Sequence, residues 1–232
     1  IENASRDLSW AGLGDRFRVD SGWFVTHLDQ KKCFFGRQEV EYIDHRITPE
    51  GVSMDPQKIS SVLNWPVPCN EKEVRGFLGL SGYYRKFVKD YGRLAKPLTD
   101  LTKKNNNFHW GTAAASAFEI LKQRLVTAPV LRLPDFSRQF TLECDASGGG
   151  LGAVLMQEGR PIAYYSKALS PATFHKSVYE KELMALVHAV QHWRQYLLGR
   201  SFIVFTDHKS LKHLFSQRMA SMDQQCWQTK LL

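Results

Sequence analysis

Residues 177–197 read SVYEKELMALVHAVQHWRQYL, and the place of this stretch between two groups of strands decides the fold. Its apolar residues recur at helical spacing, which predicts one continuous helix that ends at Gly199. The predicted buried stripe consists of Val178, Leu186, Ala189, Trp193 and Tyr196. Glu182 lies in the middle of this stripe, so the sequence directs a carboxylate toward the core of the protein.

Strand-like segments lie on both sides of the helix. Apolar and polar residues alternate from 140 to 145, and apolar runs follow at 151–157, 162–166 and 201–207. A short helix at 210–215 and a polar, helical stretch from Ser221 are predicted after them. The order of three strands, helix, strand and helix predicts an α/β fold with a mixed sheet and flanking helices.

The upstream half is predicted to be mainly helical. Residues 1–22 show no sustained period and are predicted to be a poorly organised leader, and residues 33–51 are predicted to form a hairpin. Helices are predicted to begin at Asp55-Pro56 and at Asn70, where capping residues stand. Further helices are predicted over 94–101 and 112–125, and 128–135 is predicted to be a tether.

Composition and charge narrow the classes of function. The chain has 232 residues with 43% hydrophobic content and a formal net charge of +8, which favours a globular protein with a polyanionic partner, nucleic acid first. Its four cysteines are scattered without zinc-ligand spacing, which predicts free thiols in a reducing, intracellular compartment. No apolar run approaches membrane-spanning length, and we expect no membrane partner.

Three acidic residues occupy positions that folding alone does not favour. Asp145 ends an apolar strand, Asp207 ends the most apolar strand in the chain, and Glu182 lies on the buried stripe. Burial of one unpaired carboxylate costs several kcal/mol. If the helix packs across the sheet, the three carboxylates converge, and a hard divalent cation such as Mg²⁺ or Mn²⁺ would neutralise them. Each residue also has a plainer interpretation, because either aspartate could cap a turn or helix and Glu182 could pair with an arginine.

Other motifs favour no alternative site. Residues 145–147 read DAS, which is not the Asp-Thr/Ser-Gly sequence of aspartic proteases. The glycines at 148–152 open a strand, whereas a dinucleotide-binding loop opens a helix. His188 and His192 are four residues apart on the helix but have no acidic third ligand at an evident spacing, so a zinc site is not favoured.

The chain resembles a known family over residues 23–232. The downstream segments that carry the resemblance are TLECDAS (141–147), GLGAVL (150–155), YYSK (164–167), YEKEL (179–183) and TDHKSL (206–211). They resemble the ribonuclease H domain of gypsy-type LTR-retrotransposon Pol polyproteins. The upstream segments RGFLGLSGYYRKF (75–87), PLT (97–99) and FHW (108–110) resemble the reverse-transcriptase thumb of that family.

The resemblance implies a division of the chain into parts. These are an unmatched leader (1–22), the end of the reverse-transcriptase palm (23–52), a thumb-like helical region (53–110), a connecting helix and tether (111–137) and a C-terminally truncated ribonuclease H-like domain (138–232). The rest of the Pol polyprotein, including fingers and palm, is an implied partner. A retrotransposon particle in the cytoplasm is the implied location.

The resemblance also implies the chemistry and its residues. Asp145, Glu182 and Asp207 correspond to catalytic carboxylates that bind two Mg²⁺ or Mn²⁺ ions, which hydrolyse the RNA strand of RNA–DNA hybrids. Contacts with a primer–template duplex are implied for the thumb, and Arg85, Lys86 and Lys89 are the candidate phosphate contacts. The plainer interpretation of these three residues is a solvated basic surface.

The sequence also departs from the family. The polymerase Tyr-x-Asp-Asp turn is absent, Asp44 stands where the family usually has glycine, and the chain stops before the last strand, the last helix and a fourth acidic ligand. These departures predict feeble or no hydrolysis by the isolated chain. The alternative is that the chain is a remnant that binds nucleic acid without catalysis. An integrase of the same fold is a weaker alternative, because integrases lack the thumb-like segment upstream.

Overall fold

The computed structural model describes residues 37–103, 108–147 and 149–208, together with Leu211, Gln225 and the short strands β1 (Arg16–Phe17) and β2 (Thr26–His27). Contacts divide the chain into two compact units, residues 1–40 and residues 41–232. In the first unit β1 pairs antiparallel with β2. Apart from these strands and the two single residues, the predicted leader and the helices predicted after residue 209 lie outside the described residues.

The predicted hairpin is confirmed where the chain is described. Strands β3 (Val40–Tyr42), β4 (His45–Thr48) and β5 (Gly51–Met54) form a sheet in that order. The two residues between β3 and β4, Ile43 and Asp44, have φ angles of +46° and +57°. Positive φ at both positions is the requirement of the type I′ hairpin turn, in which Asn, Asp and Gly are favoured. Asp44 therefore meets the geometric demand that a glycine would otherwise meet.

Ile43 is the strained residue of this turn, because a β-branched residue is disfavoured at positive φ. Asn tolerates this conformation, so Ile43→Asn is expected to stabilise the chain by about 1 kcal/mol. The Ile43 side chain is 61% exposed, so little packing is lost. Urea unfolding of the variant measures the gain. The matched control is Val67→Asn, which changes an exposed loop residue without positive φ; an equal gain in the control would contradict the turn explanation.

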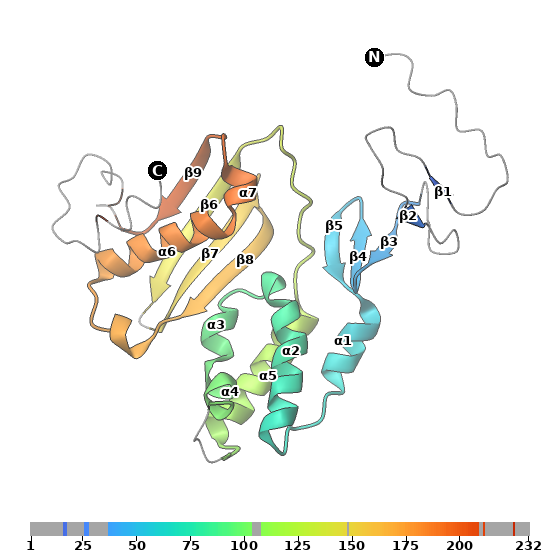
Figure 1. Ribbon diagram of the computed structural model, residues 1–232, viewed down its shortest axis with the longest axis vertical. Coiled ribbons are helices and arrows are strands. Elements are labelled where there is room, and N and C mark those ends of the chain that lie inside the picture. Colours follow the sequence, from blue (N-terminus) through green and yellow to red (C-terminus); the bar gives the residue numbers. More distant parts are fainter. Residues whose placement is uncertain are drawn as a thin grey trace. The chain divides into compact units, whose positions relative to one another are not determined.

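The described residues that directly follow the hairpin are mainly helical, and Figure 1 labels α1 to α5 among their elements. These elements are α1 (Pro56–Leu63), α2 (Glu71–Tyr83), the 3₁₀ turn η2 (Arg85–Phe87), α3 (Tyr91–Leu94), α4 (Lys96–Leu101) and α5 (Thr112–Val126). The predicted caps are confirmed, since Asp55 accepts from Gln57 N at 2.8 Å and Asn70 accepts from Glu73 N at 3.0 Å. Buried apolar side chains such as Phe77 and Phe118, with ring centroids 4.6 Å apart, form the helical core.

The helix predicted over 94–101 is wrong in its extent. Leu94 ends α3, and α4 begins separately at Lys96. Pro97 lies in the first turn of α4, and proline has no N–H to donate to the preceding turn. Proline is therefore accommodated by starting a new helix there.

The second half contains a four-stranded mixed sheet, as predicted. Its strands are β6 (Phe140–Ser147), β7 (Gly150–Gln157), β8 (Arg160–Ala168) and β9 (Phe202–Thr206), in the order β8-β7-β6-β9. The three consecutive strands are antiparallel, whereas β9 pairs parallel with β6. The parallel pairing requires a crossover, which contains the helix α6 (Val178–His192).

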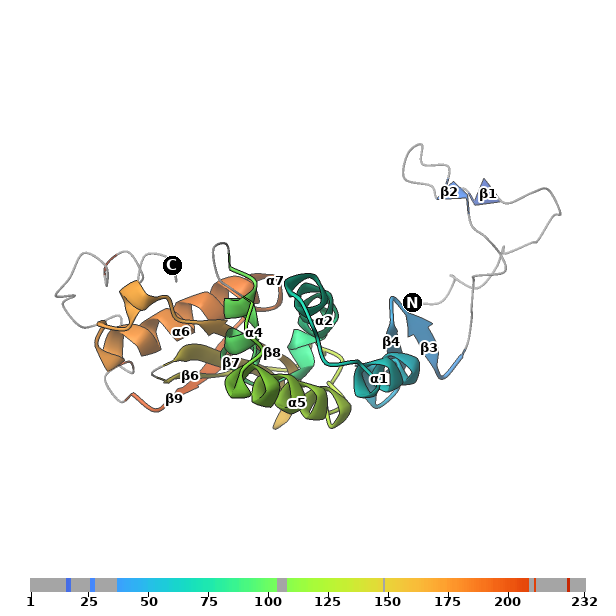
Figure 2. The same ribbon diagram turned by 90° about the horizontal axis from the view of Figure 1, so that it is seen from below.

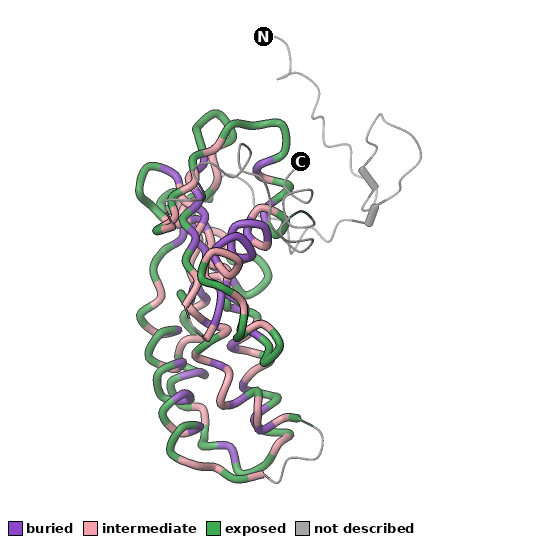
Figure 3. Tube along the Cα trace, turned by 90° about the vertical axis from the view of Figure 1, so that its left-hand side faces the viewer, coloured by how far each residue is buried: buried purple, intermediate pink, exposed green. Residues whose placement is uncertain are grey.

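Helix α6 covers one face of this sheet (Figures 1 and 2). The fully buried side chains between helix and sheet include Leu142, Leu155, Leu183 and Val187. Figure 3 shows the buried positions gathered along the helix and the strands behind it. A capping box begins the helix, in which the Ser177 hydroxyl accepts from Glu180 N and the Glu180 carboxylate accepts from Ser177 N.

The single helix predicted over 177–197 is wrong in two respects. The backbone leaves helical angles at Trp193, and a separate α7 (Arg194–Leu197) follows. Trp193 is buried and packs edge-on against Tyr165 of β8, so a tertiary contact prevails over local helical preference at this point. Val178, expected on the buried stripe, is 64% exposed, because it is the first residue of the helix.

The predicted tether is attached to the hairpin. Leu131 and Val52 exchange backbone hydrogen bonds of 2.7 and 2.8 Å, so the connection is paired with β5. The helical region also contacts the sheet, since Gly92 N donates to Ser166 Oγ at 2.8 Å. The chain is thus α+β, with a mixed sheet and flanking helices. Within the described ranges, each helix is too short or too polar to cross a membrane.

Candidate active site

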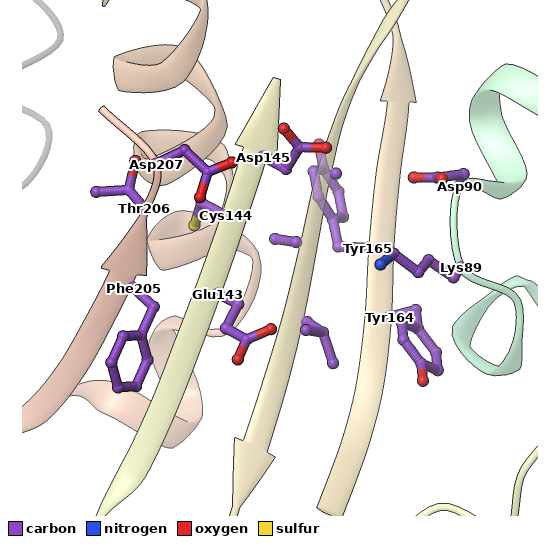
Figure 4. A pocket seen from close by; sticks show the side chains of 13 residues that line it. Lys89, Asp90, Glu143, Cys144, Asp145, Tyr164, Tyr165, Phe205, Thr206 and Asp207 are labelled. Carbon is purple, nitrogen blue, oxygen red and sulfur yellow. The ribbon is translucent and has the colours of Figure 1, made fainter. Parts of the chain in front are cut away.

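The candidate site is built first from two adjacent strand ends. Alternation along β6 places Glu143 and Asp145 on the face of the sheet away from α6, and both are exposed. Strand β9 runs parallel to β6 with Thr206 opposite Cys144, so Asp207 falls beside Asp145. Figure 4 shows the two aspartates at neighbouring strand ends. The parallel pairing is therefore what brings these side chains together.

Glu182 reaches the same strand ends from the opposite face. Its side chain is buried, with 4% exposed, and its carboxylate accepts from Ala146 N at 3.0 Å and from Thr206 Oγ1 at 3.5 Å. Burial raises the pKa of Glu182, and the charges of Asp145 and Asp207 raise it further, while the Ala146 N–H opposes them. The two aspartates therefore lie within electrostatic range of Glu182.

Among the described residues, no lysine or arginine forms an ion pair with Glu182, although the charge of His208 opposes the burial that raises the pKa of this carboxylate. None of the ion pairs within 37–103, 108–147 and 149–208 involves this carboxylate. The plainer expectation that Glu182 pairs with an arginine therefore receives no support in this part of the chain. A buried anion without such a partner fits an external cation.

The donor set is suited to a hard divalent ion, because it consists of carboxylate oxygens. However, no group of three or more His, Cys, Asp or Glu side chains is arranged to hold a metal ion within the described ranges. Figure 4 shows the Asp145 carboxylate directed toward the β7–β8 side and that of Asp207 directed toward β6. The chemistry of the residues thus fits Mg²⁺ or Mn²⁺, and their assembly around an ion stays a prediction.

A cleft of about 380 Å³ lies in front of the two aspartates (Figure 4). Its charged lining consists of Lys89, Asp90, Glu143, Asp145 and Asp207. Tyr164 and Phe205 contribute aromatic surface to the same cleft. These two aromatic residues were not predicted to belong to the site, nor were Glu143 and Asp90. The alternation along β6 could have indicated Glu143, but no local signal places Asp90 near the sheet.

The three basic residues predicted to contact nucleic acid have different surroundings. Arg85 donates to Ser166 O at 2.5 Å and lies 5.7 Å from the centroid of the Tyr91 ring, so it joins the helical region to β8. Lys86 lies 5.3 Å from the centroid of the Phe87 ring, and burial lowers its pKa. Lys89 alone of the three lines the cleft. The structure therefore does not join them into one basic patch.

Comparisons with known proteins agree with this fold. Residues 135–232 match the family model of the RNase H-like domain found in reverse transcriptase. The chain is 40% identical over 205 residues to the Retrovirus-related Pol polyprotein from transposon 297 of Drosophila melanogaster, covering 88% of this chain and 19% of that protein. Residues 135–232 therefore belong to the family of RNase H-like domains found in reverse transcriptase, and the chain is similar to retrovirus-related Pol polyproteins.

The chain is also similar to a second transposon polyprotein and, in fold, to a viral reverse transcriptase. The Transposon Tf2-3 polyprotein of Schizosaccharomyces pombe is 39% identical over 79% of this chain and 14% of that protein. A solved foamy viral protease-reverse transcriptase, in complex with RNA/DNA hybrid, has a TM-score of 0.71 and 24% identity over 84% of this chain and 28% of that chain. The present chain spans less than a fifth of the two curated polyproteins. The gypsy-type subdivision stays a prediction.

Proposed function

We propose that this RNase H-like domain hydrolyses the RNA strand of RNA–DNA hybrids with the help of divalent cations. The observation that carries the proposal is the position of Glu182. This buried carboxylate has no ion pair with a described residue and lies at the strand ends that present Asp145 and Asp207. Burial makes the ionised form of this carboxylate costly, and a bound cation would offset that cost.

The residues would divide the work as follows. Asp145 and Asp207 would bind the cations from the open cleft, and Glu182 would bind them from the side of α6. The Ala146 N–H would hold the Glu182 carboxylate in place. Bound Mg²⁺ or Mn²⁺ supplies an activated water and stabilises the leaving oxygen.

The net charge of the chain and its similarity to a viral reverse transcriptase both support a nucleic-acid partner. A chain with a formal net charge of +8 suits a polyphosphate backbone. The related foamy viral protein binds an RNA/DNA hybrid, and we extend that partner to this chain as part of the proposal. Joint work with other Pol domains on a primer–template, in a cytoplasmic particle, belongs to the same proposal.

A second candidate is binding of nucleic acid without catalysis. The observation that favours it is the absence, within the described residues, of a group of three metal-binding side chains already arranged for an ion. A cleft that only binds nucleic acid would need no such arrangement. The two candidates differ in whether the chain cleaves the hybrid in a reaction that depends on metal and on Asp145, or only binds it.

The test is cleavage of an RNA–DNA hybrid with a labelled RNA strand by the full chain, with Mg²⁺, Mn²⁺ or a chelator. We expect the feeble, metal-dependent cleavage that the sequence allows, and we expect Asp145→Asn to abolish it, because a metal ligand is lost. The matched control is Glu119→Gln, which removes an exposed carboxylate from α5. Equal metal-dependent cleavage by Asp145→Asn would overturn this site, and hybrid binding without cleavage would favour the second candidate.

A further inference from the structure

The geometry points to Lys89 as the phosphate-binding residue that the helical region contributes to the nuclease cleft, an inference that rests on the proposed function. The sequence predicts that Lys89, like Arg85 and Lys86, contacts the phosphates of a primer–template duplex. The structure places Lys89 with Asp145 and Asp207 in the cleft of about 380 Å³. Figure 4 shows its side chain extending from the helical segment toward the sheet.

The backbone that carries Lys89 is firmly packed. Its neighbour Val88 is buried, and Tyr91 is buried with its hydroxyl 2.9 Å from Ser81 Oγ. Gly92 N donates to Ser166 Oγ of β8 at 2.8 Å. A Cβ at Gly92 would lie 3.0 Å from Ala168 N, so this glycine permits the close approach to the sheet. Lys89 is therefore held beside the sheet while its side chain stays exposed.

The charges that line the cleft make a basic residue important for binding a phosphate. The sheet contributes the carboxylates of Glu143, Asp145 and Asp207, which repel a polyanion. Of the described residues that line the cleft, Lys89 is the only lysine or arginine. The neighbouring Asp90 is paired with Arg93 at 3.2 Å.

Lys89 itself makes no ion pair with a described residue. Its ammonium group is therefore available to an external anion. A flexible stem with a compact charge suits a phosphodiester oxygen, which offers a point charge. The expected ligand is a backbone phosphate of the strand that lies across the carboxylates. Binding there would position this strand at the cleft without reading its sequence.

The test compares Lys89→Ala and Lys89→Arg with Lys72→Ala, a control that removes an exposed lysine on α2. Hybrid affinity is measured over a series of salt concentrations in the full chain carrying Asp145→Asn, so that the hybrid stays intact. We expect Lys89→Ala to weaken binding about tenfold at low salt and to reduce the log–log salt slope by about 0.9. Lys89→Arg and Lys72→Ala should retain both values.

These measurements distinguish failure of the inference about Lys89 from failure of the proposed nuclease function. If the chain without Asp145→Asn does not cleave hybrid but Lys89→Ala still lowers the salt slope, the phosphate contact stands and catalysis fails. If cleavage depends on Asp145 but Lys89→Ala leaves affinity and slope unchanged, the inference about Lys89 is overturned. Equal losses in Lys89→Ala and Lys72→Ala would also overturn it, because they would indicate a general charge effect.

Discussion

Glu182→Gln is expected to raise the free energy of unfolding in metal-free buffer at neutral pH while it abolishes hybrid cleavage. The expected gain is on the order of 1 kcal/mol, because function and stability conflict at a buried charge. Burial and the charges of Asp145 and Asp207 both disfavour the ionised carboxylate, as the raised pKa of Glu182 indicates. Glutamine keeps an oxygen that accepts from Ala146 N but carries no charge.

Urea unfolding with and without Mg²⁺ measures this effect. Mg²⁺ should stabilise the unmodified chain, since a ligand that binds only the folded state shifts the equilibrium, and should stabilise Glu182→Gln much less. The control Glu119→Gln changes an exposed carboxylate and should keep the response to Mg²⁺. The explanation fails if metal-free Glu182→Gln is less stable than the unmodified chain, or if Mg²⁺ stabilises both proteins equally.

Gly51→Ala is expected to destabilise the chain by about 2–4 kcal/mol, the sum of backbone strain and lost hydrogen bonds. Gly51 begins β5 with a φ angle of +144°, which side-chain-bearing residues rarely adopt. A Cβ at this position would lie 2.0 Å from Leu131 O, so the tether must move away. That movement would break the backbone pairing of Leu131 with Val52.

Gly159→Ala is the matched control for this change. Gly159 also has positive φ, at +72°, but a Cβ there meets no atom within 4 Å. It should therefore cost only about 1 kcal/mol, the strain of the left-handed conformation alone. Urea unfolding of both variants separates strain from collision. A loss in Gly51→Ala no larger than that in Gly159→Ala would show that the tether contact contributes little.

Much of the fold could be predicted because its signals are local. The caps at Asp55 and Asn70 bond to backbone N–H groups two and three residues away, which sequence spacing reveals directly. Alternation along 140–145 indicated β6, and the order of strands and helix indicated a mixed sheet, in which β9 pairs parallel with β6. The mixed sheet was therefore predictable before any contact was known.

Sequence patterns were least informative where contacts between residues distant in the sequence determine the local structure. Trp193 interrupts a helical pattern because its ring packs against Tyr165, a contact that no local period reveals. No local pattern revealed that the Arg85 guanidinium donates to Ser166 O, 81 residues away, and its contact with phosphate stays a prediction. Pro97 did carry a local signal, and the predicted helix over 94–101 underestimated it.

By itself, the sequence determined the order of most described strands and helices, the acidic residues at two strand ends and the placement of Glu182 on a buried helical face. Only the tertiary structure decided that the Glu182 carboxylate accepts from Ala146 N, 36 residues away, and that Lys89 enters the same cleft as Asp145. The physical reason is the separation in sequence over which each kind of interaction acts. Caps and periodicity act within a few residues, whereas the cleft depends on packing between segments such as Gly92 and Ser166, which are 74 residues apart.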